Sequence, residues 1–95
     1  SNKNGHYVDW RKPMKINIYF DHLLQDLVGA KTFTLMIEKE LNFDELSKII
    51  ADKYPTIRNL IDAVSFMRNG EIVNDKKYIV KDGDEITLFI SVFGG

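Results

Sequence analysis

The chain of 95 residues contains no cysteine, only two prolines and no long hydrophobic run. Without cysteine it cannot form disulfides, thiolate metal sites or a cysteine nucleophile. Small domains without disulfides are typical of a reducing compartment, so we expect a cytoplasmic protein. No apolar stretch approaches the roughly 20 residues of a membrane-spanning helix, and no signal-peptide pattern is present. The sequence therefore predicts no membrane insertion.

The chain also lacks an excess of charge of one sign. Its 13 Lys and Arg residues nearly balance its 14 Asp and Glu residues, which gives a formal net charge of −1. Nucleic acids and anionic membranes are bound by concentrated basic patches, whereas the lysines here are scattered along the chain. We therefore expect neither nucleic acid nor a membrane as a partner.

The sequence divides into a short extension and one domain. Residues 1–13 are polar, show no regular period and include Gly5 and Pro13, so we expect an irregular N-terminal extension or a cloning remnant. Met14 would then be the natural start. A single domain would occupy residues 14–95, because a chain of this length supports one modest core.

Alternation of apolar and polar residues predicts three strands, over residues 15–20, 32–37 and 86–90. Residues 21–31 carry leucines at helical spacings before Gly29, which predicts a short helical turn between the first two strands. If that connection returns simply, these two strands are antiparallel. The side chains expected to face the core are Ile16, Ile18, Phe20, Phe33, Leu35, Ile37, Ile86, Leu88 and Ile90.

One main helix is predicted to follow Asn42. Asn42 is a favourable N-cap, and Glu45 can complete a capping box. Pro55 disfavours helical geometry at Tyr54, so the helix should end there. The apolar stripe expected on the sheet comprises Phe43, Leu46, Ile49, Ile50 and Tyr54. The stretch 56–64 is predicted to be a packed connection with one helical turn.

Two turns carry strong local signals. Asn69-Gly70 separates short strands at 65–68 and 71–73 and suits a type I′ hairpin, because both central positions need a positive φ. Asp82-Gly83-Asp84 predicts a second tight turn directly before the last strand. Asp82, Asp84 and Glu85 are too closely spaced for a calcium loop, so we expect a solvated turn and no metal site.

These elements predict an α+β fold in which a mixed sheet of four to five strands packs one face against one main helix. The first and last strands would pair in parallel at its centre. The chain then ends on Gly94 and Gly95, which carry no side chain. The carboxylate of Gly95 would therefore be presented on a slim tail, and it is the candidate functional group.

The hairpin, turn and diglycine at this spacing resemble the ubiquitin-like β-grasp sulfur-carrier proteins. The insertion at residues 23–29 resembles the small subunit of molybdopterin synthase, whereas Ile90-Ser91 stands where that subfamily usually has two prolines and is closer to the thiamine-pathway sulfur carrier. We weight the insertion more heavily, because it is a whole structural element. The matching residues are Asn69-Gly70-Glu71-Ile72-Val73, Lys81-Asp82-Gly83-Asp84-Glu85 and Gly94-Gly95.

The resemblance implies a non-catalytic carrier that binds no cofactor itself. A ubiquitin-activating-type adenylyltransferase would adenylate the Gly95 carboxylate with ATP, and sulfur would replace the adenylate to give a thiocarboxylate. The large subunit of molybdopterin synthase would then supply the catalytic groups that pass the sulfur to a pyranopterin. Three alternatives stay open: a carrier for thiamine thiazole synthesis, a ubiquitin-like modifier of lysines, and a β-grasp interaction domain without a reactive tail.

A tail that is ordered on docking loses roughly 1 to 2 kcal/mol of backbone entropy per residue, so an apolar anchor should lie beside it. Phe89 is on the outward row of the last strand, and its burial at an interface could return about 1.5 to 3 kcal/mol. Which of Phe66 and Met67 also points outward depends on a strand register that the sequence leaves open. The predicted partner-binding residues are Phe66, Met67, Arg68, Phe89 and Ser91, together with the tail Val92, Phe93, Gly94 and Gly95.

Overall fold

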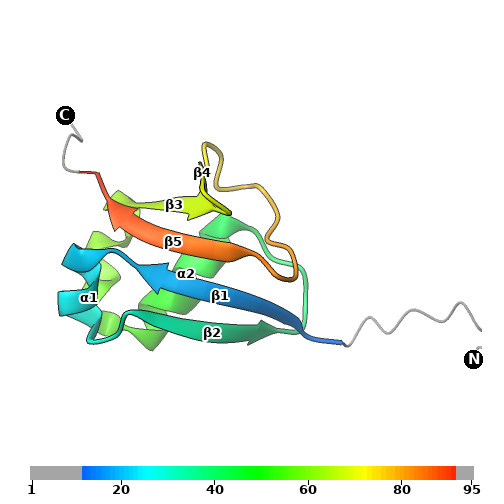
Figure 1. Ribbon diagram of the computed structural model, residues 1–95, viewed down its shortest axis with the longest axis horizontal. Coiled ribbons are helices and arrows are strands. Elements are labelled where there is room, and N and C mark those ends of the chain that lie inside the picture. The colour runs from blue at the N-terminus through cyan, green and yellow to red at the C-terminus, as the bar shows by residue number, and fades with distance from the viewer. Residues whose placement is uncertain (1–11, 92–95) are drawn as a thin grey trace, which may run out of the picture.

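The structure is a computed structural model that describes residues 12–91. A five-stranded sheet with the order β2-β1-β5-β3-β4 forms one layer, and Figure 1 views it from the side opposite α2. None of the helices within residues 12–91 is long and apolar enough to cross a membrane. The elements are β1 (Met14–Phe20), α1 (His22–Val28), β2 (Thr32–Ile37), α2 (Phe43–Lys53), the 3₁₀ helix η1 (Pro55–Ala63), β3 (Val64–Arg68), β4 (Glu71–Ile72) and β5 (Glu85–Ile90).

The strand pairing confirms the predicted centre of the sheet. β1 and β5 are parallel neighbours, with Ile18 opposite Ile86, and β2 is antiparallel to β1. β3 runs antiparallel to β5 on its other side. The chain therefore enters and leaves the domain through two adjacent central strands.

The core lies between the sheet and α2. Phe33, Leu35 and Ile90 are only partly buried, since the first two lie on the edge strand β2 and the third ends β5. The other side chains predicted to face inward from the sheet are buried, which confirms the alternation. The largest buried side chains are Phe43, Phe66, Ile16, Ile18, Leu24, Leu46, Ile50, Ile57, Ile86 and Leu88.

The predicted capping box starts α2. The Asn42 side chain accepts a hydrogen bond from the Glu45 N–H at 2.8 Å, and the Glu45 carboxylate accepts one from the Asn42 N–H at 2.9 Å. The helix ends at Lys53, before Pro55, as predicted. The connection after it differs from the prediction, because η1 is a continuous 3₁₀ segment of nine residues instead of a single turn.

The hairpin turn has the predicted geometry, since Asn69 and Gly70 have φ values of 52° and 89°. The two-residue loop places Met67 opposite Ile72. β3 begins at Val64, one residue before the predicted start, and both Val64 and Phe66 are buried. Alternation along the strand therefore turns Met67 to the outer face of the sheet.

Candidate functional site

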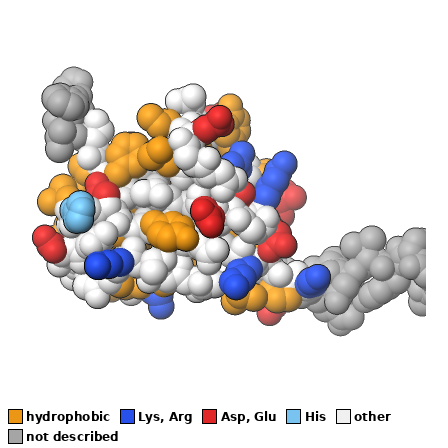
Figure 2. Space-filling view, viewed as in Figure 1, with side chains coloured by type: hydrophobic (Ala, Val, Ile, Leu, Met, Phe, Trp, Pro, Cys, Tyr) orange, Lys and Arg blue, Asp and Glu red, His pale blue; other side chains and the backbone are white. Residues whose placement is uncertain are grey.

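The face of the sheet away from α2 carries a patch of five side chains, which we call the outer patch: Tyr19, Ser65, Met67, Thr87 and Phe89. Tyr19 and Met67 are register partners of Thr87, and Ser65 is the partner of Phe89, so the five side chains lie on one face of three adjacent strands. Tyr19 is 38% exposed and the other four are half-buried. Figure 2 shows hydrophobic side chains on this face over β3 and β5. The outer patch thus combines apolar surface with two small hydroxyl side chains.

Phe89 links the outer patch to the end of the described chain. It lies one residue before the last position of β5, and the exposed Ser91 follows that strand. The predicted tail residues Val92, Phe93, Gly94 and Gly95 lie outside the described residues. The structure therefore places Phe89 and Met67 on the outer face and leaves Ser91 exposed, and the contact of these residues with a partner stays a prediction.

Phe66 does not belong to this site, which corrects the expectation that it is a partner-binding residue. Its side chain is 1% exposed, and its ring centroid lies 5.3 Å from that of Phe43 on α2. Phe66 is opposite Leu88, so it shares the inward row of β5. A partner could reach this ring only if the core opened.

The prediction that Arg68 is a partner-binding residue on the outer face is also wrong, because its side chain lies on the helix side of the sheet. Its Nη1 atom donates a hydrogen bond to the Ile79 carbonyl at 2.7 Å, and its guanidinium lies 5.5 Å from the centroid of the Phe43 ring. Nη1 is also 3.7 Å from Oδ2 of Asp84. Arg68 therefore contacts segments of its own domain and lies apart from the outer patch.

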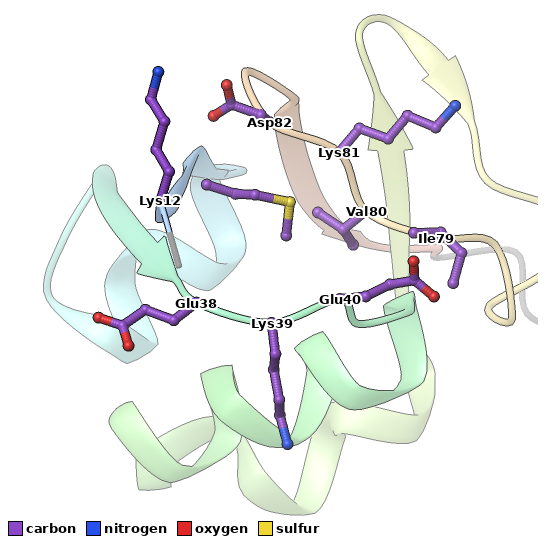
Figure 3. A pocket seen from close by; sticks show the side chains of 9 residues that line it. Lys12, Glu38, Lys39, Glu40, Ile79, Val80, Lys81 and Asp82 are labelled. Carbon is purple, nitrogen blue, oxygen red and sulfur yellow. The ribbon is translucent and has the colours of Figure 1, made fainter. Parts of the chain in front are cut away.

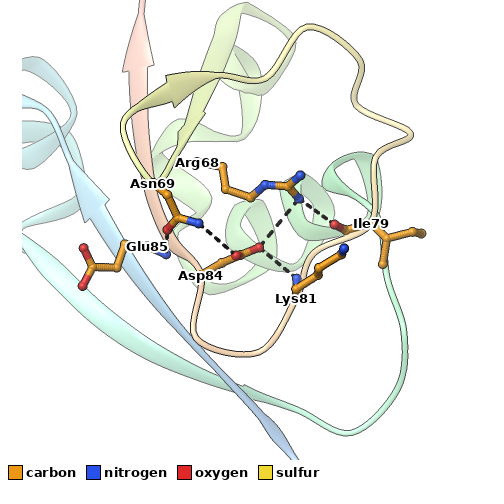
Figure 4. A network of polar contacts seen from close by, with 6 residues as sticks. All are labelled: Arg68, Asn69, Ile79, Lys81, Asp84 and Glu85. Atoms are coloured by element: carbon orange, nitrogen blue, oxygen red, sulfur yellow. Dashed lines mark hydrogen bonds and ion pairs between the residues drawn. The ribbon is translucent and has the colours of Figure 1, made fainter.

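Asp84 is the centre of a polar network beneath the two turns, shown in Figure 4. Its Oδ2 atom accepts a hydrogen bond from the Lys81 N–H at 2.8 Å, and its Oδ1 atom accepts one from Nδ2 of Asn69 at 3.3 Å. Oδ1 of Asn69 in turn accepts one from the Glu85 N–H at 2.9 Å. Asp84 is only 6% exposed, so the prediction of a solvated turn is wrong for this residue, whereas Asp82 and Glu85 are exposed.

The second turn is also attached to β1. The Gly83 N–H donates to the Lys15 carbonyl at 2.8 Å, and the Lys15 N–H donates to Oδ1 of Asp82 at 2.8 Å. Gly83 has a φ of 83°, which a residue with a Cβ rarely adopts. These bonds fix the start of β5 against β1. They thereby set the register that places Phe89 on the outer face.

A hollow of about 370 Å³ lies between the β2–α2 connection and the segment before β5 (Figure 3). No local sequence pattern indicates this hollow, because its walls come from segments that are distant along the chain. It is at the start of β5, whereas the outer patch extends toward the end of that strand. Its side chains mix three lysines with three acidic residues, and residues 12–91 contain no group of three or more His, Cys, Asp or Glu side chains that could hold a metal ion.

Comparison with known structures supports the fold. SAMP1 from Haloferax volcanii matches with a TM-score of 0.72 and 19% identity over 85% of this chain and 99% of that chain. A molybdopterin converting factor subunit 1 from Pyrococcus furiosus matches with a TM-score of 0.74 and 17% identity over 83% and 99% of the two chains. A chain in the complex of molybdopterin-converting factor subunits 1 and 2 from Helicobacter pylori matches with a TM-score of 0.60 and 21% identity over 86% and 100%. These similarities confirm a ubiquitin-like β-grasp fold.

Comparison of the sequence with curated proteins finds no match. The model of the ThiS family, in contrast, matches residues 18–95, which include the last three residues of β1, all later elements and the terminal glycines. The match covers most of the chain. The protein therefore belongs to the ThiS family of β-grasp sulfur carriers.

Proposed function

We propose that the chain carries sulfur as a thiocarboxylate on Gly95 and delivers it for molybdopterin synthesis as the small subunit of molybdopterin synthase. The observation that carries the proposal is the family match, which continues from the central strand β5 through the diglycine to residue 95. The α1 insertion adds support, because it is a formed helix of seven residues between β1 and β2.

The chemistry requires little of the carrier. The Gly95 carboxylate attacks the α-phosphate of ATP on the activating enzyme and releases pyrophosphate, which gives an acyl adenylate. Hydrosulfide released by a sulfur donor then attacks the acyl carbon, AMP leaves with the bonding electron pair, and loss of a proton gives the thiocarboxylate. A carboxylate is a poor acyl donor until it has such a leaving group. The catalytic groups and the nucleotide would therefore belong to the partner enzymes, and this chain would contribute binding surface and a terminal carboxyl group.

The proposed receiving partner is a large subunit of molybdopterin synthase. The Helicobacter pylori structure is a complex of subunits 1 and 2 of a molybdopterin-converting factor, and one of its chains has the fold described here. In our proposal the outer patch rests on the partner while the tail enters its active site. The small Ser65 and Thr87 side chains would leave the Phe89 ring accessible to the partner surface.

Incubation of the full chain with its activating enzyme, ATP and a sulfur donor is expected to convert it to the thiocarboxylate. Intact-mass spectrometry should show one oxygen replaced by one sulfur, and omission of ATP should abolish the change. If the mass is unchanged when the same enzyme charges a control carrier, the carrier proposal is wrong.

Phe89→Ala is expected to weaken binding to the activating enzyme or the large subunit by about tenfold or more, because the interface loses a phenyl ring. The ring is half-buried in the free chain, so the free energy of unfolding should fall by less than about 1.5 kcal/mol. Calorimetric titration and thermal unfolding measure the two effects. Tyr78→Ala is the matched control, since Tyr78 is an exposed aromatic residue outside the outer patch. Substantial unfolding of the Phe89 variant with unchanged binding would place the ring in the core instead.

A ubiquitin-like modifier is the second candidate, favoured by the fold similarity to SAMP1, whose full name is small archaeal modifier protein 1. In that case the activated Gly95 would form lysine-linked products, which mass spectrometry resolves as a ladder. A carrier for thiamine thiazole synthesis would form the same thiocarboxylate. It would bind a thiazole-forming enzyme and not a molybdopterin synthase large subunit, and pull-down with the two purified partners separates these cases.

A further inference from the structure

The strand β2 forms a free edge of the sheet, opposite the short edge strand β4 (Figure 1). Its six residues, Thr-Phe-Thr-Leu-Met-Ile, include no charge, proline or glycine. Soluble proteins usually blunt an edge with charge, proline or a very short strand. β4 follows this rule, since it has two residues and one of them is Glu71. β2 has none of these protective features.

The peptide groups on the outer side of β2 lack a strand partner in the sheet. The Phe20 N–H donates to the Lys31 carbonyl, and Ile18 is paired with Phe33, so odd-numbered residues of β2 direct their peptide groups toward β1. The even-numbered residues Thr32, Thr34 and Met36 direct theirs away from the sheet. These three residues could bond to another extended strand.

We infer that β2 pairs with β2 of a second copy of this chain in an antiparallel, two-fold arrangement that joins two five-stranded sheets into one. The register with the fullest overlap places Thr34 opposite Thr34 of the second copy, because only the even-numbered residues offer free peptide groups. It also places Phe33 opposite Leu35 of the second copy, and Leu35 opposite Phe33. Aromatic and aliphatic pairs of this kind stabilise adjacent strands.

The charges that flank β2 favour the antiparallel orientation. Lys31 precedes the strand and Glu38 follows it, and both side chains are exposed. An antiparallel pair brings the start of one strand beside the end of the other, so Lys31 lies near the exposed segment Glu38-Lys39-Glu40 of the second copy, whose two Glu and one Lys give it a net charge of −1. A parallel pair would instead bring Lys31 near Lys31. Opposite charges across an interface favour the first arrangement.

The apolar surface along β2 also favours pairing with β2 of a second copy. Phe33 and Leu35 point to the core side and are only half-buried, and Met36 on the outer face is 55% exposed. A second β2 would cover all three. The proposed dimer does not depend on the carrier function, because β1 separates β2 from β5 and leaves the end of β5 accessible.

The test introduces a charged residue at Thr34 in the full chain. Thr34→Lys or Thr34→Glu places two like charges directly opposite each other, which should weaken self-association about tenfold or more. An equimolar mixture of the two variants places Lys opposite Glu and should restore association. Sedimentation equilibrium measures all three samples, and Ile72→Lys is the matched control because Ile72 is a 60% exposed apolar residue on the opposite edge strand.

Thermal unfolding of each variant shows that it is folded before its association is compared. The inference is supported by a concentration-dependent wild-type dimer that the single Thr34 variants lose, the mixture regains and Ile72→Lys keeps. A wild-type chain that stays monomeric at millimolar concentration overturns it. Loss of the dimer in Ile72→Lys alone would overturn the assignment to β2, and failure of the mixture to recover would overturn the register.

Discussion

Asp84→Ala is expected to destabilise the domain by about 2 to 4 kcal/mol, which is a large part of the stability of a small domain. The buried carboxylate accepts hydrogen bonds from the Lys81 N–H and from Asn69, and it lies 3.7 Å from Arg68. The alanine variant leaves these donors without their acceptor beneath the turn. Urea denaturation followed by circular dichroism gives the change in the free energy of unfolding.

Asp82→Ala is the matched control, because Asp82 belongs to the same turn but is exposed. It accepts one hydrogen bond, from the Lys15 N–H at 2.8 Å, so its loss should cost only about 0.5 to 1.5 kcal/mol. Asp84→Asn should fall between the two alanine variants, since it keeps one acceptor oxygen but places an amide near the donors. Equal effects of the two alanine changes would show that burial does not distinguish the two carboxylates.

The sequence predicted the elements whose signals are local. Asn69-Gly70 identified the hairpin because both residues must adopt positive φ, and Asn42 with Glu45 identified the start of α2 because a capping box involves only four residues. The alternation in β1 and β5 also identified their buried faces. The parallel pairing of β1 with β5 could be predicted from the packing of one helix on one sheet. The register between these two strands could not be predicted in this way.

The errors concern contacts between distant segments. A strand that starts at Ser65 does not show which way the Phe66 side chain points. Inclusion of Val64 would have revealed the alternation that buries both Val64 and Phe66. The burial of Asp84 depends on Asn69 and Arg68, which are 15 and 16 positions earlier and become neighbours only when β3 pairs with β5. No local pattern contains that information.

The two parts of the candidate site, Phe89 and Gly95, were predicted on different grounds. Phe89 was assigned to the outer face from alternation alone, and the structure places it there beside Ser65. The role of Gly95 came from a resemblance and stays a prediction, although the family match extends to that residue. The choice between molybdopterin and thiamine depends on which partner receives the sulfur, and neither alternation nor fold encodes the partner's identity.

Deletion of Gly95 is expected to reduce the rate of thiocarboxylate formation at least about 100-fold. The deletion withdraws the carboxyl group by about 3.5 Å, and misplacement of a reacting group by as little as about 1 Å can lower a rate 100-fold. The free energy of unfolding should change by less than about 0.5 kcal/mol, because the buried core lies between Ile16 and Leu88. Intact-mass spectrometry over time gives the rate, and urea denaturation gives the stability.

One alanine appended after Gly95 moves the carboxyl group equally far in the other direction and adds a methyl side chain at the end of the tail. We expect the same loss of charging. That result would show that the rate depends on the position of the carboxylate and not only on a minimum length of the tail. Lys48→Ala is the control for handling and folding, since Lys48 is exposed on α2 and lies on the other side of the sheet from the outer patch. Charging of the shortened and extended chains at the wild-type rate would mean that the activating enzyme does not position residue 95. The proposal that the reacting carboxyl group must lie at residue 95 would then fail, although the fold and the family assignment would stand.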